Sequence, residues 1–157
     1  MLKKLILLAG FTLIALFLQV LLVPWMTIQD IRPDFILILV LFVGHLKGKM
    51  AGQLYGFGIG LLMDVLGMGS FLGLSALTKT VAGFSAGFLH SQKSRINPLG
   101  FYGINLLIIF LHFLILYLIN FKGSDFSFEF ILLRYMLPAT IYSGVFYILI
   151  DYLFPID

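Results

Sequence analysis

The chain has no cysteine and few charged residues, which excludes many functions at once. Charged residues are 11% of its 157 residues, against about a quarter in an average soluble domain. Without cysteine there is no disulfide, no thiolate metal site and no thiol nucleophile. The net charge of +3 comes from scattered loop residues, so no basic face for nucleic acid is indicated. A hydrophobic content of 61% and a mean hydropathy of +1.11 indicate an integral membrane protein.

The patterns that catalysis requires are also missing from the sequence. We find no glycine-rich phosphate loop opening a helix, no Ser/His/Asp constellation and no close pair of carboxylates for acid–base work. Asp30 and Asp34 are too few for a metal site, and His45, His90 and His112 are scattered. We therefore expect no enzymatic activity, no cofactor and no metal.

Apolar runs occupy almost the whole chain. A membrane-spanning helix needs about 20 residues, so the chain has room for five or six crossings and little else. We predict an all-α, polytopic membrane protein with six transmembrane helices in a single transmembrane domain, residues 1–157. The predicted segments are Leu5–Val23, Asp34 or Phe35–Leu46, Ala51–Leu66, Phe71–Leu89, Leu99–Phe121 and Phe128–Phe154.

Two of these segments and one turn carry further expectations. The second segment is short enough to extend into the loop before it, to tilt or to re-enter the membrane. Pro138 lacks an amide proton, so it predicts a kink that sets off an interfacial piece, Phe126–Leu133. A tight turn is predicted at Gly67–Ser70.

The basic residues predict the orientation, because lysine and arginine near the ends of spans are retained on the cytoplasmic side. Six spans with both termini in the cytoplasm place six of the ten basic residues on that side: Lys3, Lys4, Lys47, Lys49, Lys93 and Arg95. Arg32, Lys122 and Arg134 fall on the outer side, and Lys79 falls inside a span.

The third and fourth segments form a hairpin in which each arm carries small residues at four-residue spacing. This spacing places them on one helix face, where another backbone can approach closely. The residues are Gly52, Gly56, Gly60 and Asp64 on the first arm, and Lys79, Gly83 and Gly87 on the second. The two faces most simply pack on each other, and the alternative is an interface with another protein.

Asp64 and Lys79 lie within predicted spans, where charge is expensive and marks a candidate site. Counted from the cytoplasmic ends of their segments, they lie at similar depth, so the two can form an ion pair. Alternatively, Asp64 caps the outer end of its helix while Lys79 reaches a water-filled cleft or a backbone carbonyl. A third possibility is a polar pathway. Asn105 and His112 share a face of the fifth segment and are predicted to form buried hydrogen bonds.

The arrangement of residues 32 to 89 resembles the rod-shape-determining MreD family. The resemblance rests on Arg32-Pro33-Asp34 before an aliphatic span, the Gly52 to Asp64 series, the Gly67–Gly69 turn, and Gly73-Leu74-x-Ala76-Leu77 followed by Gly83-x3-Gly87. It implies a six-helix fold similar to the substrate-binding subunits of energy-coupling-factor transporters. It also implies a bacterial inner-membrane component that binds the single-span protein MreC. The family pattern supplies no catalytic residues.

Two classes of function follow. The first is a non-enzymatic scaffold of the cell-elongation machinery that supports rod shape and lateral peptidoglycan synthesis. The resemblance implies MreC as its partner, together with the elongation glycosyltransferase–transpeptidase pair, and the composition adds membrane lipids. The second is a small-molecule binding or transport subunit with an outward-facing pocket in the membrane, lined by Asp64, Lys79, Asn105 and His112. The candidate partner-binding or structural residues are Pro33, Asp34, Gly52, Gly56, Gly60, Asp64, Lys79, Gly83 and Gly87.

Overall fold

A computed structural model describes the backbone of residues 2–69 and 71–154, and the side chains of this part from residue 9 onward. The chain is 78% helical, and no strand occurs in these residues apart from an isolated bridge between Ile28 and Ile31. The predicted all-α class is confirmed for these residues. Met1, Ser70 and residues 155–157, which belong to the predicted domain and turn, lie outside the described part.

The helices follow the apolar runs closely. In chain order they are α1 Leu2–Phe17, the π-helical turn η1 Leu18–Leu22, α2 Val23–Met26, α3 Phe35–Lys47, α4 Lys49–Val65, α5 Leu74–Ala86, the 3-10 turn η2 Gly87–Leu89, α6 Pro98–Asn120, α7 Phe128–Ile131, the π-helical turn η3 Leu132–Met136 and α8 Leu137–Leu153. Most predicted boundaries differ from these by three residues or fewer.

Both π-helical turns precede a proline. Pro24 is among the first residues of α2 after η1, and Pro138 among the first of α8 after η3. A wider turn accommodates a proline because the regular backbone ladder is already interrupted there. The irregularity near Pro138 is the π-helical turn η3, and the helical stretch Phe128–Leu153 continues through it. The interfacial position of Phe126–Leu133 stays a prediction.

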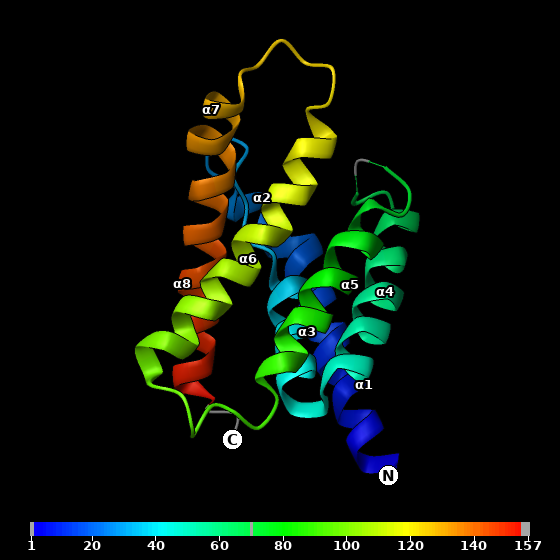
Figure 1. The fold of residues 1–157 in the computed structure, drawn as a ribbon. Coiled ribbons are helices and arrows are strands. Elements are labelled where there is room, and N and C mark those ends of the chain that lie inside the picture. The colour runs from blue at the N-terminus through cyan, green and yellow to red at the C-terminus, as the bar shows by residue number, and fades with distance from the viewer. Residues whose placement is uncertain (1, 70, 155–157) are drawn as a thin grey trace.

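The helices run back and forth between the two ends of an elongated bundle (Figure 1). The start of α1, the turn between α3 and α4, the loop between α5 and α6, and the end of α8 lie at one end. Helix α3 is central: its residues from Phe35 to Leu41 are buried except for the partly buried Leu39. It packs against α1, α4, α5 and α8.

Within the described residues, three helical stretches are long and apolar enough to cross a membrane, namely Ala9–Met26, Pro98–Asn120 and Phe128–Leu153. Helix α3 is apolar but shorter. With 13 residues it extends about 20 Å, less than the ~30 Å hydrocarbon core. Because α3 is surrounded by other helices, its backbone ends can be satisfied by protein rather than by lipid or water.

Candidate functional site

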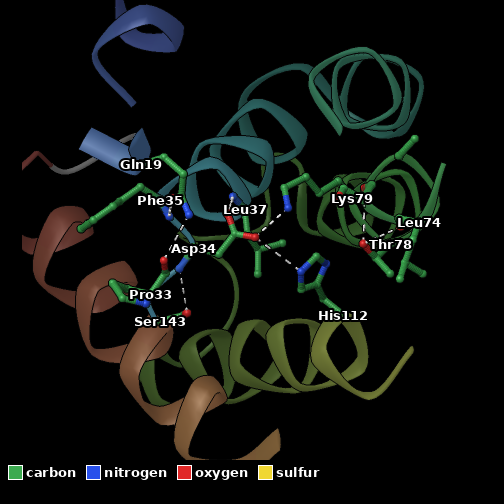
Figure 2. Close-up of polar contacts among 12 residues, drawn as sticks. Gln19, Pro33, Asp34, Phe35, Leu37, Leu74, Thr78, Lys79, His112 and Ser143 are labelled. Atoms are coloured by element: carbon green, nitrogen blue, oxygen red, sulfur yellow. Dashed lines mark hydrogen bonds and ion pairs between the residues drawn. The ribbon is translucent and has the colours of Figure 1, made fainter. Parts of the chain in front are cut away.

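Asp34 lies at the centre of a polar cluster inside the helix bundle (Figure 2). It is the N-cap residue of α3, and its Oδ1 accepts a hydrogen bond of 2.8 Å from the backbone N–H of Leu37. Pro33 precedes it, and Asp34 itself has the extended backbone (φ −109°, ψ 90°) that an N-cap residue adopts. The carboxylate is thus held where α3 begins, with its second oxygen free to contact other helices.

Lys79 of α5 supplies the opposite charge. Its Nζ lies 2.6 Å from Asp34 Oδ2, and the two side chains are 2% and 13% exposed. The predicted pair of Lys79 with Asp64 is therefore wrong. The carboxylates of Asp34 and Asp64 both lie at a depth similar to that of Lys79. Helix α3 lies beside α5 at this level, so Asp34 reaches the lysine. A buried ion pair of this kind is costly to break from one side, because the remaining charge has no water.

Asp64 instead caps the N-terminus of α5. Its Oδ2 accepts from the backbone N–H groups of Gly73 and Ala76, at 2.9 and 3.2 Å, and its Oδ1 accepts from Ser75 N–H at 3.2 Å. These N–H groups have no partner within the helix, and the helix dipole favours a negative charge there. Asp64 therefore ties the end of α4 to the start of α5.

Three further side chains join the cluster around Asp34. His112 of α6 places Nε2 3.6 Å from Asp34 Oδ2, and Ser143 Oγ of α8 accepts a hydrogen bond of 3.2 Å from the backbone N–H of Asp34. Gln19 of η1 accepts from Phe35 N–H at 2.9 Å. The start of α3 thus contacts η1, α5, α6 and α8 through polar groups. We name the set Gln19, Asp34, Lys79, His112 and Ser143 the Asp34 cluster.

The small-residue faces of α4 and α5 pack directly on each other. A Cβ atom added at Gly52 would overlap the carbonyl oxygen of Gly83, and one at Gly56 would overlap that of Lys79. One at Gly60 would meet Ser75 and Ala76, and one at Gly87 would overlap the backbone of Lys49. Internal packing is therefore the observed role of these glycines, because no side chain or partner helix fits between α4 and α5.

A cavity of about 1070 Å³ lies between the Asp34 cluster and the loops at the end of the bundle opposite the start of α1. Its polar lining comprises Gln19, Thr27, Asp30, Arg32, Asp34, Ser75, Lys79 and Asn120, and its aromatic lining comprises Phe71, Phe113, Tyr117, Phe121 and Tyr135. Of the four residues predicted to line an outward-facing pocket, only Lys79 does so. Asp64, Asn105 and His112 are buried but are not part of this lining.

A second polar cluster at the opposite end of the bundle was missed by the reading of the sequence. Asp151 of α8 is 3% exposed, accepts from Lys93 Nζ at 2.9 Å and from Tyr102 Oη at 2.8 Å, and lines a smaller cavity of about 170 Å³. The sequence did hold a signal for this cluster, because Asp151 is an ionisable residue inside the last predicted span. Gln19 and Ser143 carried a weaker one, because both are polar residues in apolar runs.

Asn105 and His112 are both buried on α6, as their shared face predicted. Asn105 donates to the carbonyl of Phe101 at 2.9 Å, whereas neither ring nitrogen of His112 has a hydrogen-bond partner among the described residues. No group of three His, Asp or Glu side chains in the described part of the chain could hold a metal ion.

The comparisons with known proteins agree with this picture of a helical membrane protein. A family model for rod shape-determining protein MreD matches residues 1–155. The chain belongs to the MreD family. This family is a shape-determining membrane component and not a known enzyme family. No curated protein and no solved structure showed a significant match to this MreD family member.

Proposed function

We propose that the chain is a non-enzymatic scaffold of the bacterial cell-elongation machinery that binds MreC in the inner membrane and supports lateral peptidoglycan synthesis. The observation that carries this proposal is the family match over residues 1–155, which makes a role in rod shape the starting point. The glycosyltransferase–transpeptidase pair that extends the wall is the next expected partner. None of these partners needs a reactive centre in the chain.

The architecture supports a multi-pass scaffold. Its helices traverse the bundle alternately, and both described chain ends lie at the end that also carries Lys47, Lys49, Lys93 and Arg95. That end is the cytoplasmic one by the distribution of basic residues. We therefore propose one transmembrane domain with six crossings and cytoplasmic termini, similar to the substrate-binding subunits of energy-coupling-factor transporters.

In this proposal the predicted site residues act inside the bundle, and other glycines supply the outer faces. Asp34, Lys79 and the glycines between α4 and α5 hold the bundle in one shape, and partner helices dock on its outer faces. Gly10 of α1, Gly58 of α4 and Gly103 of α6 have nothing within 4 Å of an added Cβ. Outward-facing glycines allow a partner backbone to approach closely in the membrane.

Co-purification of MreC from membranes tests the proposal. Gly10→Leu, Gly58→Leu and Gly103→Leu each fill one outer face on a different helix, and we expect at least one to lower MreC recovery while the level of the chain stays normal. Cells carrying that variant should lose rod shape. Gly56→Leu is the matched internal control, because it should lower the level of the chain itself.

Two results would contradict the proposed scaffold function. Wild-type protein that never recovers MreC from membranes containing both proteins contradicts the scaffold assignment. The same conclusion follows if cells without the chain keep their rod shape.

One observation favours the alternative function of a small-molecule binding or transport subunit. The cavity of about 1070 Å³ has charged residues in its wall, which a scaffold alone does not require. Uptake of a solute that depends on Arg32 and Lys79, with normal MreC recovery, would favour this function.

A further inference from the structure

The large cavity carries charges of both signs in equal number. Lys79 and Asp34 neutralise each other as an ion pair, so Arg32 contributes the remaining positive charge and Asp30 the remaining negative charge. Asp30 and Arg32, at the loop end of the cavity, form no ion pair with any described residue. An occupant that carries only one sign of charge would be repelled by one half of this set. The charge complement therefore favours an occupant with both signs.

The cavity wall holds a polar group that the protein leaves without a partner. Lys79 is not available to an occupant, because its side chain is 2% exposed and its Nζ is paired with Asp34 Oδ2. Asn120 lines the same cavity, and its Oδ1 is buried without a hydrogen-bond partner among these residues.

One wall of the cavity suits an ammonium group. Tyr117, Phe121 and Tyr135 line it, and the guanidinium of Arg134 already lies 5.6 Å from the ring centroid of Tyr135, so Tyr117 and Phe121 are the rings left for a ligand cation. A cation over the faces of such rings is attracted by their electron density. Asp30 adds a negative charge to the same cavity.

The volume and the remaining wall indicate that the occupant also has an apolar part. Small-molecule sites usually measure about 300–1,000 Å³, and this cavity of about 1070 Å³ would stay mostly empty around a small head group alone. Val20 of η1 and Phe71 also line it and are 49% and 54% exposed, so they can contact an alkyl chain.

We propose that this cavity binds one zwitterionic phospholipid. Its phosphate pairs with Arg32, and its ammonium group lies near Asp30 and the rings of Tyr117 and Phe121. One acyl chain follows the apolar wall past Val20. This site is separate from MreC binding and does not depend on the proposed function.

Lipid retention in purified full-length protein tests the inference. The chain is reconstituted with phosphatidylethanolamine or with the anionic phosphatidylglycerol, re-extracted in mild detergent and examined by native mass spectrometry. We expect one retained phosphatidylethanolamine per chain and about tenfold weaker retention of phosphatidylglycerol. Arg32→Gln and Asp30→Asn should each lower phosphatidylethanolamine retention about tenfold, because each removes one charge-assisted contact.

Matched controls separate the cavity from general surface charge. Lys122→Gln and Asp125→Asn remove the same charges from the adjacent outer loop, outside the cavity wall. Both should retain the lipid as the wild type does, and all four variants should show the same thermal midpoint. Equal retention of the two lipids, unchanged retention in Arg32→Gln and Asp30→Asn, or displacement by equimolar soluble phosphoethanolamine would each overturn the inference.

Discussion

At the residue scale, Asp34 combines two tasks. Its Oδ1 caps α3 through Leu37, and its Oδ2 holds the ammonium of Lys79 at 2.6 Å. Capping satisfies a backbone N–H that lipid cannot satisfy, and pairing neutralises a lysine that is almost fully buried. Loss of Asp34 therefore affects both the start of α3 and the middle of α5.

A double-mutant cycle measures the ion pair. Asp34→Asn or Lys79→Met alone should lower the free energy of unfolding in detergent by about 3–5 kcal/mol, because each strands a buried charge. The double variant should recover most of that loss.

Asp64→Asn with Lys79→Met serves as the comparison cycle for this pair. Its two effects should add within about 0.5 kcal/mol, since the two side chains share no contact. Strong coupling in this second cycle, together with additivity in the first, would mean that the lysine pairs with Asp64 after all.

Asp64 gives a prediction of its own. Asp64→Ala leaves the N–H groups of Gly73, Ser75 and Ala76 without their acceptor. A lost cap costs about 0.5–2 kcal/mol, and we expect the upper end because Ser75 and Ala76 are buried and Gly73 is partly buried. Hydrogen exchange at residues 73–76 should accelerate, whereas the exposed-loop variant Asp125→Ala should leave both stability and exchange unchanged.

The sequence identified the charged residues but not their pairing. Asp34 lies 13 residues before Lys47, and Asp64 lies 13 residues after Ala51, so both are about 20 Å from the cytoplasmic end. Depth alone could not choose between them. The choice depends on which helix lies beside α5 at that level, and a single sequence holds no record of lateral neighbours.

At the element scale, α4 and α5 form the closest helix pair of the bundle. Their backbones touch at the glycines, so carbonyl groups of one helix occupy the space where side chains of the other would lie. The four-residue spacing predicted this face correctly, because helical periodicity is a local property. The π-helical turns were less predictable, since only their prolines mark them.

Two alanine substitutions on the same helix should have opposite effects. Gly56→Ala forces a methyl group onto the carbonyl of Lys79 and should cost about 1–3 kcal/mol of stability. Gly58→Ala meets open space and should be neutral or stabilise by up to about 1 kcal/mol, because alanine is the better helix former. Thermal unfolding of both variants in one detergent measures this difference. Equal destabilisation would show that the α4–α5 contact is looser than the structure has it.

At the scale of the whole molecule, the open question is whether the short helices α3, α4 and α5 cross the membrane. Three stretches are long enough without help, and composition alone predicted more. The length of a helix surrounded by protein need not match the thickness of the hydrocarbon core, because neighbouring protein replaces lipid around it. Composition and basic residues thus predicted the all-α class and both chain ends at one end of the bundle, whereas the cavity depends on how the helices pack in three dimensions.

The absence of cysteine makes this question directly testable, because a single introduced cysteine is the only thiol in the chain. In intact cells, a membrane-impermeant maleimide should label Ser124→Cys, in the loop between α6 and α7, but should label Ser94→Cys, between α5 and α6, only after permeabilisation. Leu72→Cys decides the issue. Leu72 is 80% exposed in the turn between α4 and α5, so six crossings place it outside with Ser124. Labelling of Leu72→Cys only after permeabilisation would mean that α4 and α5 enter and leave the membrane on the cytoplasmic side, and the chain would then have fewer than six crossings.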